Sequence, residues 1–364
     1  MKRLLTGGFM SGLYDGYTEI KTEGKATYFA GANTGHGFVS SYPALADENR
    51  LKRVYILKGG PGTGKSTMLA RIAEKADCTV EYDRCGSDPD SLDCVVLGGS
   101  VAVLDGTSPH IRDMQTPGAA STLVDLSRFW NEKELTKARD RITALAAEKS
   151  LAYASAYRWL AASETLESER TAAIVRLFRY DKADSWCTRF IRKLPKPTVH
   201  TVTERYTHAI SMKGRVCVNT LAGSADVVYT VHDAYGCAEP FLDLLASRLK
   251  TAGYAVLIGR HPIGERITGI LLPEQGIAVT VGRSEGARSL NMTRFVTEKI
   301  PTDLRGEIRL ATRCMNECLT SAEQCLKSAA HAHFELEKIY SSAMDFAALR
   351  ETCESLCREV CALL

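Results

Sequence analysis

The fold of this chain is decided by the stretch Leu57-Lys58-Gly59-Gly60-Pro61-Gly62-Thr63-Gly64-Lys65-Ser66-Thr67. From Gly59 to Ser66 it fills the pattern G-x-x-x-x-G-K-[ST] completely. The glycines let the backbone curl so that successive N–H groups point inward at a phosphate, which the lysine also reaches, while the serine hydroxyl faces a magnesium ion. The stretch therefore predicts a phosphate-binding loop, or P-loop.

The segments on either side of this loop supply the context that the motif requires. Residues 53–57 are apolar and β-branched, which predicts a strand. After the loop, residues 68–76 place their apolar side chains on one helical face, and the N-terminus of such a helix adds partial positive charge at the phosphate site. We therefore expect the phosphates of a nucleoside triphosphate, ATP by preference, to be bound by Gly59, Gly60, Pro61, Gly62, Thr63, Gly64, Lys65, Ser66 and Thr67.

A second segment belongs with the P-loop. Val101-Ala102-Val103-Leu104-Asp105 has the pattern of a buried strand that ends in a carboxylate. On a neighbouring parallel strand, such a carboxylate lies beside the P-loop and holds Mg²⁺, usually through water. We therefore predict that Ser66 and Asp105 hold Mg²⁺ and that Lys65 and Asp105 are catalytic.

Composition sets limits on the class of protein. The chain has 364 residues, enough for two domains, and its 46 basic and 43 acidic residues leave a net charge of +3. This balance disfavours a strong nucleic-acid binder. No apolar run approaches the roughly 18 residues of a membrane span, and residues 1–8 hold too short an apolar core for a signal peptide. We expect a cytoplasmic protein with no membrane partner, whose 12 cysteines are reduced.

The second half of the chain repeats the first in weakened form. Aligning residues 228–240 with residues 54–66 preserves the strand and the loop, but Glu239 stands in place of the P-loop lysine and Pro240 in place of its serine. A negative charge there would repel phosphate. The sequence therefore predicts a loop without its phosphate chemistry.

The alignment continues without a gap from residues 80–106 to residues 256–282. Within it Arg260 matches Arg84, whereas Val281 replaces the carboxylate at the end of the second strand. Because lysine and carboxylate are lost together, we interpret the second half as an inert copy with a structural or regulatory role.

These patterns predict an α/β protein in which a P-loop NTPase core, a parallel sheet with flanking helices, is duplicated in tandem. Helix-forming residues without an interrupting proline follow each core, and residues 194–198 form a proline-containing linker. We expect a P-loop domain at 1–194, with a core at about 28–130 and a helical hairpin as its appendage at 131–193. We expect a degenerate domain at 195–364, with a core at about 205–300 and a helical tail at 302–364.

The chain also resembles a family of uncharacterised bacterial P-loop ATPases built as two tandem P-loop-like halves. The resemblance is carried by Tyr28-Phe29-Ala30-Gly31-Ala32-Asn33-Thr34, by Lys58 to Ser66, by Cys85-Gly86-Ser87-Asp88-Pro89-Asp90-Ser91-Leu92-Asp93 and by Leu104-Asp105-Gly106-Thr107-Ser108-Pro109-His110. It implies ATP binding and hydrolysis, and it supplies no established substrate. In such relatives the second half often keeps its own P-loop, and here it does not.

Hydrolysis also needs a group that orients the attacking water. Gly106 occupies the obvious position after the second strand. Asp83 and Asp88 follow the strand predicted at residues 79–82 and would project from the same sheet edge, so Asp83 is the first candidate for a catalytic base and Asp88 the second. Asp88 also precedes a proline and is a natural turn or cap residue. His110, just beyond the second strand, either contacts a γ-phosphate or simply lines a loop.

Three functional classes follow from these residues. ATP hydrolysis by the first half, beside an inert second half, is the preferred interpretation. The alternatives are a small-molecule kinase, in which an aspartate accepts the proton of a substrate hydroxyl, and a nucleotide-binding switch with little turnover that recruits a partner. A protein partner or a second copy of the chain is compatible with all three. Nucleic acid is the least favoured partner, although basic and aromatic residues alternate within residues 176–196.

Overall fold

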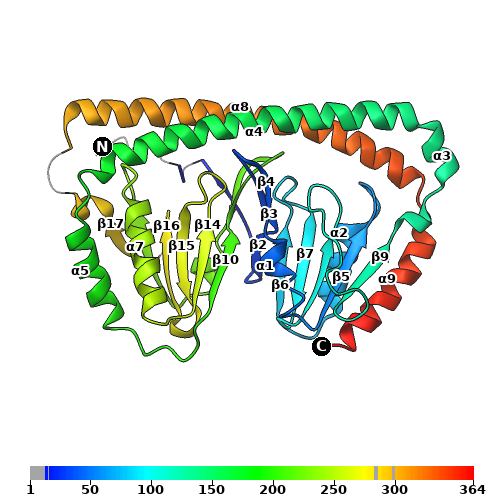
Figure 1. The fold of residues 1–364 in the computed structure, drawn as a ribbon, viewed down its shortest axis with the longest axis horizontal. Coiled ribbons are helices and arrows are strands. Elements are labelled where there is room, and N and C mark those ends of the chain that lie inside the picture. Colours follow the sequence, from blue (N-terminus) through cyan, green and yellow to red (C-terminus); the bar gives the residue numbers. More distant parts are fainter. Residues whose placement is uncertain (1–12, 15, 283–285, 297–299) are drawn as a thin grey trace, which may run out of the picture.

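The computed structural model describes residues 13–14, 16–282, 286–296 and 300–364. Within this part of the chain, a mixed sheet of twelve strands runs through the molecule, with helices packed on it (Figure 1). The structure is therefore α/β with flanking helices. Residues 1–8, on which the argument against a signal peptide depends, lie outside the described residues.

The sheet divides, between two neighbouring central strands, into two lateral halves, which are called the first side and the second side below. From the centre outward, the first side contains β2 (Ala26–Phe29), β6 (Val80–Arg84), β7 (Leu92–Leu97), β8 (Val101–Asp105), β5 (Arg53–Lys58) and β9 (Ser121–Asp125). The second side contains β10 (Val202–Tyr206), β14 (Val256–Arg260), β15 (Ile267–Leu272), β16 (Ile277–Val281), β13 (Val227–His232) and β17 (Arg288–Asn291). They meet where β2 and β10 pair antiparallel at Phe29 and Tyr206.

Both sides pair their strands in the same sequence of directions. Outward from β2 the pairs are parallel, antiparallel, antiparallel, parallel and parallel, and outward from β10 the order is identical. Leu57 lies opposite Asp105, and Val231 lies opposite Val281, in the register of the sequence alignment.

The alignment without a gap is wrong at one strand. Asp83 pairs with Cys94 on the first side, but Gly259 pairs with Gly269 on the second, which shifts β15 by one residue. The connection at residues 85–91 is one residue longer than its counterpart at residues 261–266, and the next connection compensates. Strand pairing therefore corrects what sequence matching alone could not resolve.

Smaller elements complete the two sides. On the first side these are α1 (Tyr42–Leu45), η1 (Ser127–Phe129) and the pair β3 (Gly31–Thr34) and β4 (Gly37–Ser40); on the second they are α6 (Thr220–Gly223), η2 (Pro273–Gln275) and η3 (Met292–Phe295). A separate sheet joins β1 (Thr18–Ile20), β12 (Gly214–Val218) and β11 (His208–Ser211). In each side, the strand next to the edge strand is followed by a loop and then a helix: α2 (Lys65–Lys75) after β5, and α7 (Ala238–Thr251) after β13.

Two long helices lie side by side above one edge of the sheet, at the ends of its strands, and extend over both sides (Figure 1). These are α4 (Arg139–Val175), which follows the short α3 (Glu132–Lys137), and α8 (Thr302–Ser342). They run antiparallel, since Leu145 near the start of α4 packs with Leu336 near the end of α8, and Leu160 packs with Leu319. The helical hairpin expected after the first core is therefore wrong, because the apolar side chains of α4 pack against α8 instead.

One shorter helix follows each of these two long helices, and the two shorter helices pack on different sides of the sheet, one on the second side and one on the first. Ala183 of α5 (Tyr180–Ile191), which follows α4, packs in the core around α7 on the second side. Leu356 and Val360 of α9 (Phe346–Cys361), which follows α8, pack against α2 on the first side. Each side of the sheet is thus completed by helices that come from the other half of the chain.

The cysteines are free thiols. Cys353 and Cys357 contribute to the core between α2 and α9, whereas Cys361 is exposed. Among the described residues, no helix combines the length and the apolar character that crossing a bilayer demands.

Candidate functional site

The segment predicted to be a P-loop, called the P-loop below, lies between β5 and α2, as the sequence predicts. Gly62 and Gly64 have φ values of +68° and +84°, a left-handed conformation that favours glycine. Gly64 is the N-cap of α2, and no side chain caps this helix end. The first N–H groups of α2 are therefore left for a ligand, in the arrangement that binds anions.

Lys65 and Asp105, far apart in the sequence, are brought together behind this loop. The Lys65 ammonium group donates hydrogen bonds to the carbonyl oxygens of Gly60 at 2.6 Å and Gly59 at 3.2 Å, and its Nζ lies 3.6 Å from Oδ2 of Asp105. Parallel pairing of β5 with β8 creates this proximity. Burial raises the pKa of Asp105, and the Lys65 charge opposes that shift.

Ser66 and Asp105 have the donor atoms that Mg²⁺ prefers. The Ser66 hydroxyl oxygen accepts the Leu92 N–H at 2.9 Å and retains a lone pair, and Asp105 uses Oδ1 to accept the Thr107 N–H at 2.8 Å. Oδ2 of Asp105 is then left facing Lys65. One hydroxyl and one carboxylate fit an ion that takes its remaining ligands from water and phosphate.

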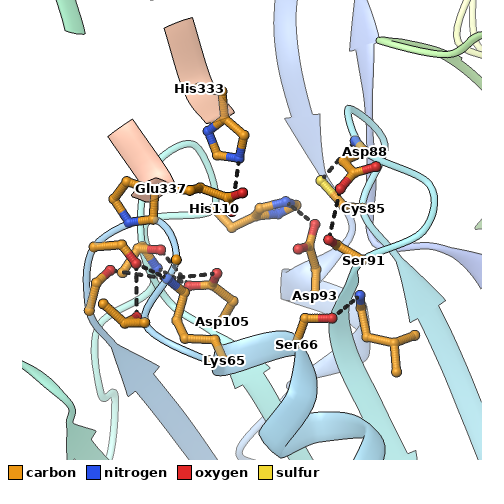
Figure 2. A pocket seen from close by; sticks show the side chains of 18 of the residues that line it. Lys65, Ser66, Cys85, Asp88, Ser91, Asp93, Asp105, His110, His333 and Glu337 are labelled. Atoms are coloured by element: carbon orange, nitrogen blue, oxygen red, sulfur yellow. Dashed lines mark hydrogen bonds and ion pairs between the residues drawn. The ribbon is translucent and has the colours of Figure 1, made fainter. Parts of the chain in front are cut away.

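A cavity of about 660 Å³ opens over the P-loop (Figure 2). This volume lies within the usual range for small-molecule sites, about 300–1,000 Å³. One wall is formed by the loop. The opposite wall comes from the ends of β6, β7 and β8, and the cover comes from the long helices and α9; together they contribute Cys85, Asp88, Ser91, Leu92, Asp93, Thr107, Ser108, Pro109, His110, Lys149, His333, Glu337 and Phe346.

Helix α8 touches the P-loop directly. A Cβ atom on Gly62 would lie 2.6 Å from the backbone oxygen of Glu337, so only glycine fits under this helix. The Glu337 carboxylate accepts a hydrogen bond from the Gly62 N–H, and its Oε1 lies 3.4 Å from Nε2 of His333. The pKa of Glu337 is lowered, first by His333 and further by Lys65 and Gly62. An acidic side chain from the second half of the chain thus faces the phosphate-binding loop.

The two predicted base candidates lie in different surroundings. Asp88 lines the cavity, where its Oδ2 accepts a hydrogen bond from the Ser91 hydroxyl at 2.9 Å. Asp83 is fully buried and does not line the cavity, because β6 continues through Arg84 rather than ending at Tyr82. In the part of the chain that the structure describes, neither carboxyl oxygen of Asp83 has a hydrogen-bond partner. Burial, and then the charge of Glu81, raise the pKa of Asp83 well above its usual range.

Asp83 should make the protein less stable as the pH rises. Its pKa in the unfolded chain is about 3.9, so above that pH the unfolded state has released a proton that the folded state keeps. Stability then falls with increasing pH by up to about 1.4 kcal/mol per unit. We expect Asp83→Asn to flatten this dependence in urea unfolding between about pH 5 and pH 8.

Asp88→Asn is the matched control for this measurement, because Asp88 lies on the cavity surface. It should leave the slope of the wild type in place. Equal slopes for wild type and Asp83→Asn would contradict a protonated, buried Asp83.

Sequence reasoning considered several cavity residues singly and missed how they combine. Asp93 and His110 approach each other, with Oδ2 and Nε2 2.6 Å apart, and both side chains are buried. Their common position at the carboxyl edge of the sheet was the available signal. Lys149, His333 and Glu337 carried no comparable signal, because they reach the cavity only through the packing of α4 and α8.

The corresponding loop of the second side holds a carboxylate of its own. Asp233 accepts the N–H groups of Tyr235, Gly236 and Cys237 through Oδ1, at 3.1, 2.9 and 2.9 Å, and that of Ala238 through Oδ2, at 3.0 Å. These are the backbone groups that would otherwise cradle a phosphate. Glu239, from which the sequence predicted repulsion, forms an ion pair with Arg266 instead. The internal carboxylate explains why no phosphate would bind here.

Removing this carboxylate should destabilise the fold. We expect Asp233→Ala to lower the free energy of unfolding by about 2 kcal/mol, because it uncaps α7 and leaves loop N–H groups without an acceptor. Urea unfolding measures this loss. Asp303→Ala is the control, since Asp303 is exposed in the first turn of α8 and caps nothing; equal midpoints for the two variants would contradict the role of Asp233.

Comparison with known proteins gives this chain no relative: no family model, no curated protein and no solved structure matches it. The function is therefore argued from the site alone.

Proposed function

We propose that this chain is an ATP-binding P-loop NTPase whose first half hydrolyses ATP with Mg²⁺ and whose second half is a degenerate tandem copy with a structural or regulatory role. The observation that carries the proposal is the approach of Lys65 to Asp105, 3.6 Å apart, beneath an uncapped helix N-terminus in a cavity of nucleotide size. A glycine-rich turn without a ligand would have no reason to bury a lysine and a carboxylate together.

Each residue then has a defined task. The loop N–H groups and Lys65 bind the β- and γ-phosphates, for which Lys65 exchanges its bonds to the Gly59 and Gly60 carbonyls. Ser66 and Asp105 would hold Mg²⁺, which when bound neutralises charge on the phosphate oxygens. Positioning and charge stabilisation supply most of the catalysis in phosphoryl transfer, and both are present in this arrangement.

The degenerate copy is supported by strand order and by the reciprocal helices. The same strand order and directions recur on both sides of the sheet, and β5 pairs with β8 in the register in which β13 pairs with β16. An aspartate at the first glycine position and a valine at the carboxylate position remove the nucleotide chemistry from the second side. What this side retains is its connection through α8 to the intact P-loop.

A small-molecule kinase is the second candidate, favoured by the cavity wall opposite the P-loop. Asp88 and Asp93 place carboxylates there, beside His110, where an acceptor hydroxyl could lose its proton. The acceptor would take the place of the attacking water. Both reactions use the same P-loop.

The test is to measure ADP and inorganic phosphate separately from Mg·ATP and the purified protein. Equal amounts of both would establish hydrolysis. ADP without free phosphate, together with a phosphorylated product, would establish transfer. Nucleotide binding without turnover would favour the switch, and absence of nucleotide binding would overturn the proposal.

A further inference from the structure

Three potential metal ligands meet on the cavity wall opposite the P-loop. Cys85 directly follows β6, Asp93 lies in β7, and His110 lies in the loop after β8. The sulfur, one carboxylate oxygen and one imidazole nitrogen all lie within 4.8 Å of one another. Figure 2 shows these side chains directed toward a common region, apart from Lys65 and Ser66. Three separate strand ends thus bring together three side chains of different ligand chemistry.

Within the described part of the chain, the imidazole of His110 and one carboxylate oxygen of Asp93 are buried and lack hydrogen bonds, whereas the partly buried Cys85 sulfur accepts the Asp88 N–H at 3.5 Å. Asp93 is 6% exposed and His110 is 3% exposed. Among the described residues, neither ring nitrogen of His110 has a hydrogen-bond partner, and neither does Oδ2 of Asp93, although Oδ2 lies 2.6 Å from Nε2. The two atoms are close without the alignment that an N–H···O bond needs. Buried polar groups are normally satisfied, so this set calls for an additional partner.

Aromatic packing holds the imidazole in place instead. Tyr42 stacks on His110 with ring centroids 4.8 Å apart, and Phe38 meets it edge-on at 4.5 Å. The Tyr42 hydroxyl is itself bonded to the backbone oxygens of Asp93 and Asp105, at 2.9 and 2.8 Å. The ring is therefore fixed before any ligand arrives, as a metal site requires.

The second side of the sheet forms without the thiol and the carboxylate of this cluster. When the two sides are matched by their strand pairing, His261 takes the position of Cys85. Thr268 takes the position of Asp93. That side has the same strand order without a thiol and a carboxylate at these positions. The cluster thus occurs on the side that also keeps the P-loop lysine and Asp105, which points to a role in the site rather than in folding.

We propose that Cys85, Asp93 and His110 bind one transition-metal ion, Zn²⁺ by preference, at a site separate from that of Mg²⁺. Thiolate and imidazole ligands select such ions, whereas Ser66 and Asp105 offer only the hard oxygen atoms that suit Mg²⁺. Three protein ligands leave a fourth position open toward the cavity, the pattern of catalytic rather than structural zinc.

Binding requires a small local adjustment. With metal–ligand distances of about 2.0–2.2 Å, the nitrogen and oxygen of a tetrahedral site lie about 3.3 Å apart, so Oδ2 and Nε2 must separate by less than an ångström from their 2.6 Å contact. The sulfur lies within 4.8 Å of both and must move slightly inward. Side-chain rotations alone cover these distances.

The test is Co²⁺ titration of the full-length protein after chelator treatment, without nucleotide. Co²⁺ replaces Zn²⁺ in such sites and reports its ligands in its absorption spectrum. We expect one equivalent to give visible bands of a four-coordinate ion and a sulfur-to-cobalt charge-transfer band, all removed by Zn²⁺. Cys85→Ser should abolish the charge-transfer band, and His110→Ala should weaken Zn²⁺ binding by about 100-fold or more.

Cys361→Ser is the matched control, because Cys361 is the exposed thiol most open to adventitious cobalt. It should leave the spectrum unchanged, and circular dichroism should show that all variants are folded. Absence of a charge-transfer band in the wild type, or a band that survives Cys85→Ser, would overturn the proposal. Because nucleotide is omitted, neither result depends on ATP hydrolysis.

Discussion

Replacing Lys65 with alanine is expected to lower Mg·ATP turnover by at least about 100-fold, the loss typical of removing one preorganised charge from a phosphoryl or oxyanion site. Lys65 is 9% exposed and is the cation closest to both the loop carbonyls and Asp105. Without it, the β- and γ-phosphates lose their positive partner. Asp105 also loses the nearby charge that lowers its pKa and so counteracts the effect of burial. Steady-state ADP formation measures the effect.

Lys75→Ala is the matched control for this experiment. Lys75 lies in the last turn of the same helix, α2, where it pairs with Glu354 of α9 outside the cavity. Its removal should change turnover by less than about twofold. A Lys65→Ala variant that hydrolyses ATP at the rate of the wild type, while remaining folded, would show that the loop is not the catalytic site.

Local features of this fold could be predicted from the sequence. The strand, loop and helix around Lys65 depend on contacts within one short segment, so apolar periodicity and glycine positions are sufficient to predict them. Asp105 could be placed beside the loop because parallel strands end at one edge of a sheet. Gly236, which the alignment of the two halves places opposite Gly62, has the same left-handed conformation.

Long-range packing could not be predicted in the same way. A helical pattern shows that residues 139–175 form a helix, but it does not show which surface that helix covers, and α4 pairs with α8. The end of β6 was misplaced because Asp83, a residue that normally disfavours a strand, is accommodated in its buried interior. The cluster of Cys85, Asp93 and His110 required the register of three strands, which no single motif contains.

The pairing of α4 with α8 brings Lys149 to the cavity. This residue lies on α4, half-buried at the cavity, and no hydrogen bond or ion pair within 4 Å engages its ammonium group among the described residues. Burial lowers the pKa of Lys149, while Glu337 raises it and Lys65 lowers it further. Lys149 and Glu337 line the same cavity as the P-loop, so a terminal phosphate bound there would bring a further negative charge to the side of this cation.

We therefore expect Lys149 to act in cis on the transferred phosphate, as arginine fingers do in NTPases. On this basis, which depends on the proposed ATPase function, Lys149→Met should reduce kcat by about 100-fold or more with a smaller change in KM, because the charge matters most in the transition state. Methionine keeps the length and the apolar packing of the side chain. Single-turnover phosphate release separates this loss from slower product release.

Glu148→Gln provides the control, since the neighbouring Glu148 is exposed on the same turn of α4 and does not line the cavity. Lys149→Arg should retain part of the rate, because it keeps the charge. If Lys149→Met turns over ATP like the wild type, α4 covers the site without taking part. If kcat falls as expected, a helix that spans both sides of the sheet supplies a catalytic charge, and any partner that displaces α8 from α4 would change the rate of hydrolysis.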